Sequence, residues 1–172
     1  MTRINALTLV QAPAATQMAL QGVEKGLGFI PNAFATLAHS PAALGGYLAL
    51  SQALNKNNLS PAEREVAALA ASEVNGCDYC IAAHSFFGAK AGLDADALLA
   101  ARAGTLDGVA AFARAVTISR GQISDAQLVA AREAGLDDAK IVDVIAQVSL
   151  LTLTNYLNNV AMTDIDFPPA GK

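Results

Sequence analysis

Apolar residues recur along most of the chain at intervals of three and four positions, which is the spacing of one face of an α-helix. The segment 59–76 shows this spacing at Val66, Leu69, Ala70 and Val74. Strict alternation of apolar and polar residues, the mark of a half-buried strand, is rare. Only residues 6–10 and 148–154 can be argued as strands, and the second stretch lies inside a longer helical period. The pattern therefore predicts an all-α fold.

Capping residues divide this pattern into separate helices. Ser40 and Ser60 are each followed by proline, a favoured N-cap and first helical residue. Glu63 completes a capping box with Ser60, and Asn75-Gly76 ends that helix. Glycines end most of the later helices. The predicted helices lie within 40–56, 59–76, 77–92, 94–104, 106–121, 124–135 and 137–160. We expect a bundle of about seven or eight helices in a single domain, residues 1–172.

The composition adds an expectation about assembly. The chain is 53% hydrophobic and only 15% charged, whereas about 25% is typical of soluble domains. The most apolar helix, 141–160, is interrupted by five polar residues, Asp143, Gln147, Asn155, Asn158 and Asn159, so we expect no membrane span. A chain so poor in charge must bury apolar surface outside its own core. We therefore expect a homo-oligomer.

The net charge of −4 and the pI near 5.0 give no electrostatic reason to expect nucleic acid or an acidic membrane as a partner. Residues 1–13 contain one arginine and no sustained apolar stretch, so we expect no signal peptide and a cytoplasmic location. In that compartment two cysteines favour redox or metal chemistry over a structural disulfide framework.

Both cysteines and one of the two histidines lie within residues 77–84. Cys77 and Cys80 fall in the first turn of a predicted helix, where free N–H groups and the helix dipole favour a thiolate. A Cys-x-x-Cys pair in that position can close a disulfide with little backbone movement. His84 lies one turn beyond Cys80 on the same face, where a neutral imidazole can take the thiol proton directly or through one water.

Glu65 is a candidate partner of His84. If Asn75-Gly76 is the turn of a helical hairpin, Glu65 lies within a turn of His84, where its carboxylate would orient the ring and raise its basicity. The alternative is that Glu65 belongs, with Glu63 and Arg64, to a solvated charge cluster.

The cysteine segment has two other interpretations. Cysteines are often small buried hydrophobic residues, but two of them at this spacing with a histidine one turn on favour chemistry. A zinc site would use Cys77, Cys80, His84 and Glu65. Structural zinc usually takes ligands from two separated pairs, and here there is one pair. We therefore expect neither a metal nor another cofactor.

The spacing Glu65, Cys77, Cys80 and His84 resembles the core motif of the AhpD-like alkylhydroperoxidases, which belong to the carboxymuconolactone decarboxylase superfamily. The resemblance covers roughly residues 25–168, and the segments 28–50 and 154–168 are similar to the peroxidase-related branch. It implies an all-helical fold that assembles as trimers or hexamers, and a peroxidase that reduces organic hydroperoxides.

The resemblance also implies a role for each residue. Cys80 would attack the peroxide and pass through sulfenic acid, and Cys77 would be the resolving thiol and proton donor. His84 and Glu65 would form the proton relay, and the electron donor would be a lipoylated or thioredoxin-like dithiol protein. The best-known members have a histidine where this chain has Tyr79. Tyrosine, with a pKa of about 10, is no base near neutral pH, so this departure predicts a shorter relay and less reactive thiols.

Two alternative functions stay open at this point. One is a redox-responsive interaction protein, whose disulfide switches an interface without turnover. The other is a carboxymuconolactone decarboxylase-like lyase, although the authentic lactone decarboxylases lack the cysteine pair. Outside the motif, His39 is expected to be a loop or capping residue. Phe86 and Phe87 are expected in the core, with the lining of an apolar substrate pocket as the alternative.

Overall fold

The computed structural model describes residues 1–170, which contain nine α-helices and no strand. The helices are α1 (Ala14–Leu27), α2 (Asn32–Leu37), α3 (Pro41–Leu54), α4 (Pro61–Val74), α5 (Asp78–Lys90), α6 (Ala95–Ala103), α7 (Gly108–Ser119), α8 (Asp125–Glu133) and α9 (Asp138–Ala161). The all-α prediction is confirmed. Each of the seven segments expected to be helical contains one helix, and α1 and α2 precede them. The last two positions of the expected domain, 171 and 172, lie outside the described residues.

The N-terminal region differs most from the sequence expectation. Residues 6–10, which could be argued as a strand, form a loop in which the Thr8 carbonyl accepts hydrogen bonds from the N–H groups of Gln11 and Ala12. Helix α1 follows Pro13 without a side-chain cap. This helix therefore lacks the Ser-Pro start signal that predicts the beginnings of α3 and α4. Residues 148–154 lie inside α9, as their helical period predicted.

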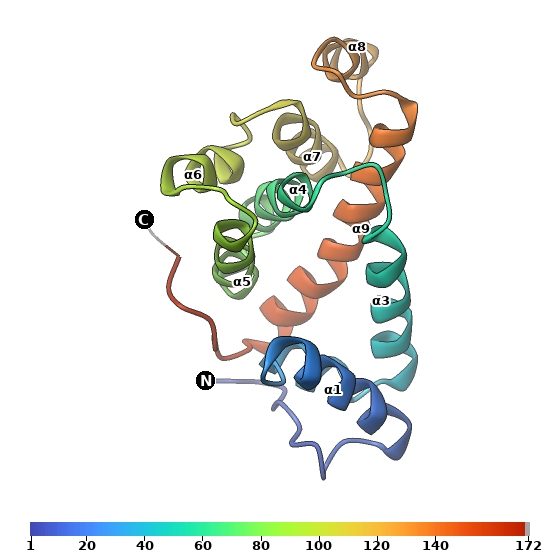
Figure 1. Cartoon of the computed structure of the whole chain (residues 1–172), viewed down its shortest axis with the longest axis vertical. Helices are drawn as coiled ribbons and strands as arrows, with labels where there is room; N and C mark the ends of the chain where they lie inside the picture. The colour runs from blue at the N-terminus through green and yellow to red at the C-terminus, as the bar shows by residue number, and fades with distance from the viewer. Residues whose placement is uncertain (171–172) are drawn as a thin grey trace.

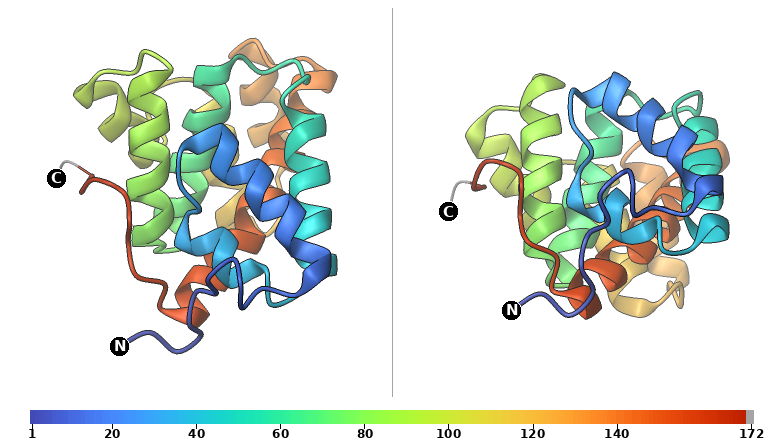
Figure 2. Two further views of the ribbon diagram at one scale, coloured as in Figure 1. Left: turned by 60° about the horizontal axis from the view of Figure 1, so that its bottom comes forward. Right: turned by 90° about the horizontal axis from the view of Figure 1, so that it is seen from below.

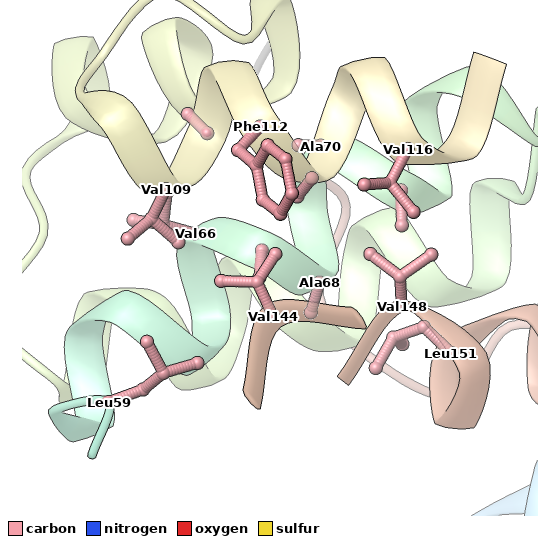
Figure 3. Packing of buried hydrophobic residues seen from close by; sticks show 14 of the residues in the cluster. Leu59, Val66, Ala68, Ala70, Val109, Phe112, Val116, Val144, Val148 and Leu151 are labelled. Atoms are coloured by element: carbon pink, nitrogen blue, oxygen red, sulfur yellow. The ribbon is translucent and has the colours of Figure 1, made fainter. Parts of the chain in front are cut away.

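Helix α4 lies at the centre of the molecule and packs against α5, α6, α7 and α9 (Figure 1). Six consecutive residues of α4, Val66–Ala71, have almost no exposed surface, and four of them are alanines. Their small side chains let the neighbouring helices approach closely. Figure 3 shows Val66 of α4 and Phe112 of α7 meeting Val144 of α9 in this core.

The hairpin of α4 and α5 positions the cysteine segment. Its turn begins at Asn75, the C-cap of α4, and continues through Gly76, whose φ of +61° lies in the left-handed region that glycine adopts readily. The Cys77 N–H then donates to the Ser72 carbonyl at 3.0 Å, which closes the end of α4. The side chain of Asn75 also donates to Asn155 Oδ1 of α9 at 2.8 Å, so the turn is fixed to a third helix.

The C-terminal segment after α9 runs along α5, as both views of Figure 2 show. Phe167 of this segment packs edge-on against Phe29, Tyr79 and Phe87. The N-terminal residues reach the same region, because the Arg3 N–H donates to the Ala161 carbonyl at 2.7 Å. Throughout residues 1–170, every helix falls short of the continuous apolar length that crossing a bilayer requires.

Candidate active site

The two cysteines form a contacting pair of free thiols at the start of α5. Cys77 is the N-cap, and its Sγ accepts a hydrogen bond from the Cys80 N–H at 3.3 Å. The Cys77 thiol in turn donates to Cys80 Sγ at 2.6 Å. Both side chains are buried. A disulfide between these sulfur atoms therefore requires little movement of the backbone.

The structure makes the two thiols unequal, whereas helix position alone favoured neither. The hydrogen bond from Cys77 is the largest influence that lowers the pKa of Cys80 to about 6, and the charge of His84 and the amides of Asn158 and Asn155 act in the same direction against the effect of burial. The pKa of Cys77 is raised far above its ordinary value, because Cys77 gives its hydrogen bond to Cys80 and is itself buried. Cys80 is thus the thiolate at neutral pH, and Cys77 keeps its proton.

His84 and Glu65 are brought together by the α4–α5 hairpin. Their Nδ1 and Oε2 atoms lie 2.7 Å apart, and each side chain keeps about a fifth of its surface exposed, 19% and 21% respectively. Burial alone would lower the pKa of His84, but the charge and hydrogen bond of Glu65, helped by Cys80, raise it above its ordinary value. The imidazolium form is therefore favoured beside the Cys80 thiolate.

Glu65 does not belong to a solvated charge cluster with its two neighbours. Glu63 closes the capping box on Ser60 and binds Lys140 Nζ at 2.7 Å. The Arg64 guanidinium donates to the Leu59 carbonyl at 2.7 Å. Only the Glu65 carboxylate turns toward the thiol pair, as the hairpin geometry predicts.

Tyr79, which stands where the best-known relatives have a histidine, points away from the relay. Its hydroxyl donates to Asp166 Oδ1 at 2.7 Å and accepts from the Ala33 N–H at 3.2 Å. Burial is the main cause that raises the pKa of Tyr79 above its ordinary value, so the hydroxyl keeps its proton. Asp166 also accepts from the Asn32 N–H at 2.7 Å, at the start of α2. Tyr79 therefore fastens the C-terminal segment to α5 and α2.

Two buried amides of α9 complete the surroundings of the thiols and were not predicted from the sequence as site residues. Asn158 Nδ2 donates to Cys80 Sγ at 3.3 Å. Asn155 Nδ2 donates to Ser72 Oγ at 3.1 Å and holds the turn at Asn75. In the sequence these residues are two amides three positions apart in an apolar helix, and they were used only as evidence against a membrane span.

A small cavity of about 70 Å³ lies against Cys80 and His84. Its other lining residues are Pro31, Ala33, Phe34, Leu37, Tyr47, Tyr79, Ala83, Phe87, Thr154, Asn158 and Phe167. Most of these side chains are apolar, so the cavity suits the alkyl or aryl part of a small molecule. Phe87 therefore lines the cavity, which was the alternative to core packing in the sequence analysis. Phe86 packs against Phe87 and Phe167 instead, with Lys90 Nζ 4.2 Å from its ring centre.

The remaining candidates from the sequence lie apart from this cavity. His39 is exposed in the loop before α3, and its Nε2 lies 3.0 Å from the Asn5 carbonyl oxygen. Within residues 1–170, no three His, Cys, Asp or Glu side chains are arranged to hold a metal ion. Cys77, Cys80, His84 and Glu65 form hydrogen-bonded pairs in this structure rather than one ligand set.

The chain is similar to known proteins in sequence and in fold. The model of the carboxymuconolactone decarboxylase family matches residues 41–120, which include all four motif residues. No curated protein sequence matches the chain. A solved structure described as an alkylhydroperoxidase AhpD core, an uncharacterized peroxidase-related protein from Ralstonia eutropha JMP134, is 26% identical with a TM-score of 0.83. The alignment covers 96% of this chain and 92% of that one.

Two further solved structures have the same fold. An uncharacterized peroxidase-related protein from Silicibacter sp. TM1040 is 22% identical over 98% of this chain and 95% of that one, with a TM-score of 0.79. The debrominase Bmp8 is 18% identical over 96% of this chain and 93% of that one, also with a TM-score of 0.79. A C82A form of that debrominase was solved in complex with 2,3,4-tribromopyrrole.

Proposed function

Because the chain belongs to the carboxymuconolactone decarboxylase superfamily and has the AhpD-like fold, we propose that it is a thiol-dependent peroxidase that reduces organic hydroperoxides. The observation that carries this proposal is the contact of 2.6 Å between Cys77 and Cys80 at the wall of an apolar cavity. It supplies a thiolate, a neighbouring thiol and a place for the organic group of a substrate.

In the first step the Cys80 thiolate attacks the terminal oxygen of the hydroperoxide. The S–O bond forms as the O–O bond breaks, so that Cys80 is oxidised to sulfenic acid and the alkoxide leaves. The alkoxide takes a proton from the His84 imidazolium, whose Nδ1 is engaged by Glu65. The product is an alcohol.

In the second step Cys77 attacks the sulfur of the Cys80 sulfenic acid. The S–S bond forms, the Cys77 proton and the hydroxyl group leave together as water, and both cysteines end in a disulfide. A dithiol donor then reduces the disulfide by thiol exchange and returns the site to its starting state. A lipoylated or thioredoxin-like protein is the proposed donor, and a cytoplasmic location is proposed because that compartment keeps thiols reduced.

The test is a peroxide-reduction assay with a dithiol reductant on the wild type, Cys80→Ser and Cys77→Ser. The proposal expects turnover in the wild type and none in Cys80→Ser, with Cys77→Ser stopped after one oxidation. Stoichiometric oxidation of the wild type, with a change in oligomer size and no turnover, would instead favour the redox-responsive interaction protein. Lyase activity that survives replacement of both cysteines would favour the lyase.

A second candidate is cysteine-dependent removal of bromine from an aromatic ring. The observation that favours it is the set of aromatic side chains beside Cys80, namely Tyr79, Phe87 and Phe167, since a flat ring fits between such groups. Debrominase Bmp8 shares the fold. Bromide release from 2,3,4-tribromopyrrole, measured in the wild type and in Cys80→Ser, decides between the two activities.

A further inference from the structure

The amide of Asn158 contacts the sulfur of Cys80 from a helix that does not carry His84 or Glu65. Its Nδ2 lies 3.3 Å from Cys80 Sγ, and the residue is only 4% exposed. The relay residues come from α4 and α5, whereas Asn158 comes from α9. Cys80 therefore receives an N–H donor from a third helix, in addition to its contacts with Cys77 and His84.

The other end of the same amide has no partner among the described residues. Asn158 Oδ1 is buried and makes no hydrogen bond within residues 1–170. Leaving a buried carbonyl unpaired costs stability, and an apolar side chain of similar shape would avoid that cost. Stability alone therefore does not explain an asparagine at position 158, and a chemical role at the Cys80 sulfur explains it better.

We propose that Asn158 is a further catalytic residue, whose NH₂ group stabilises the Cys80 thiolate and whose carbonyl accepts the hydroxyl of the sulfenic acid formed on that sulfur. The second half rests on the proposed function, because only attack on a peroxide places an O–H group there. Since the carbonyl and the NH₂ group share one carbon atom, both lie beside Cys80. The amide thus binds the sulfur before oxidation through one end and after oxidation through the other.

The two ends have separate consequences. Loss of the NH₂ group removes a hydrogen bond to a charged sulfur, which lowers the fraction of thiolate at a given pH. Loss of the carbonyl removes the acceptor that keeps the sulfenic acid protonated. The anion of a sulfenic acid reacts further with peroxide to give sulfinic acid, so this loss speeds overoxidation.

The first experiment measures the thiolate and needs no peroxidase activity. The rate of Cys80 alkylation by iodoacetamide is followed against pH by mass spectrometry in the wild type and Asn158→Leu. The matched control is Asn159→Leu, because the adjacent Asn159 is exposed and its amide donates to the Asn75 carbonyl. The other titratable groups that act on or near Cys80 are Cys77, His84, Glu65, Tyr47 and Tyr79, and all are unchanged in these variants.

The expected result is a profile displaced to higher pH in Asn158→Leu, with roughly tenfold slower alkylation below the midpoint, and an unchanged profile in the control. Asn158→Ala gives the same comparison if the leucine variant does not fold. An unchanged profile in a folded Asn158 variant overturns the role of the NH₂ group.

The second experiment measures the sulfenic acid in a Cys77→Ser background, where no disulfide can form. Asn158→Leu and Asn158→Asp are treated with tert-butyl hydroperoxide at a pH above the Cys80 pKa of each variant. The aspartate keeps an acceptor oxygen and the leucine does not. We expect several times more sulfinic acid in Asn158→Leu than in Asn158→Asp, and equal amounts overturn the role of the carbonyl. If the alkylation profile shifts as expected in Asn158→Leu but the wild type never turns over peroxide, the proposed function is contradicted and the role of the NH₂ group still stands.

Discussion

The hydroxyl of Tyr79 donates a hydrogen bond to Asp166 Oδ1 at 2.7 Å. Tyr79, which directly precedes Cys80, therefore connects α5 to the C-terminal segment and makes no hydrogen bond to His84 or Glu65. The proposed relay consists of His84 and Glu65 alone. Tyr79 therefore anchors the C-terminal segment, and its hydroxyl is engaged by Asp166 rather than by His84 or Glu65. The low pKa of Cys80 is reached without Tyr79.

Tyr79→Phe should weaken the anchor and leave the thiols almost unchanged. Removing the donor to the Asp166 carboxylate should lower the free energy of unfolding by about 1–2 kcal/mol, or the melting temperature by roughly 2–8 °C. Thermal unfolding and the pH profile of Cys80 alkylation measure the two effects. Tyr156→Phe, at an exposed position of α9, is the matched control. A large change in thiol reactivity would show that Tyr79 does take part in the relay.

Glu65→Gln should slow the peroxidase step by roughly 10²-fold, which is typical of a general acid–base group. The substitution keeps the size and hydrogen bonding of the side chain but removes the charge that raises the pKa of His84. The pKa of His84 should fall and that of Cys80 should rise, as measured by NMR titration and alkylation. Glu63→Gln is the control, since Glu63 binds Lys140 instead. Equal effects of the two substitutions would remove Glu65 from the relay.

The pH dependence of stability should differ between the wild type and Cys80→Ser. Because folding lowers the pKa of Cys80 from 9.0 to about 6, its contribution is complete above pH 9 and is lost as the pH falls toward 6. The wild type should therefore gain stability over the variant across this window, by at most about 1.4 kcal/mol per pH unit. Above pH 9 the opposite shift of Cys77 removes stability, because only the unfolded chain ionises that thiol. Urea unfolding at several pH values measures the difference, and parallel curves would mean that Cys80 is not a thiolate.

Mild oxidation should join Cys77 and Cys80 within one chain. Their sulfur atoms are already in contact, and each has no other cysteine in the chain to pair with. Counting free thiols before and after one equivalent of peroxide should show both lost together. Cross-links only between chains, or thiols that persist, would contradict the arrangement of the site.

The protein should be a homo-oligomer at micromolar concentration, and a trimer or hexamer is the proposed form. Five large apolar residues of α9 are exposed along one side of the helix, Val142, Ile145, Leu153, Tyr156 and Val160. Burial of such a surface between subunits would explain the low charge of the chain. Light scattering should give a multiple of the 17.6 kDa chain mass, and Leu153→Glu with Val160→Glu should reduce it. A wild type of monomeric mass would contradict this expectation.

The parts of the structure that could be predicted depend on short-range rules. Ser60 and Glu63 mark the start of α4 in the sequence, and Gly76 follows its end. The hairpin of α4 and α5 then brings Glu65 to His84. These relations follow from helix geometry and a short turn. Helix geometry did not give the order of the two thiols, which only the family resemblance implied, because it depends on which sulfur donates the hydrogen bond between them. The contact of Asn158 with Cys80 could not be predicted either, since the two residues are 78 positions apart in the sequence. The direction of Tyr79 is set in the same way by Asp166, 87 positions away.

The alanines of α4 set how closely α4 packs against its neighbours, which include α5 with the reacting sulfur and α9 with its amide. Ala67, Ala68, Ala70 and Ala71 have no exposed surface, so the distance between their neighbours is fixed by single methyl groups. An added methyl group there would overpack the core at a cost of about 1–3 kcal/mol and shift those helices apart. A contact such as the 3.3 Å between Asn158 and Cys80 has little room for such a shift. The distance between Asn158 and Cys80 thus depends partly on four alanines, none of which carries a functional group.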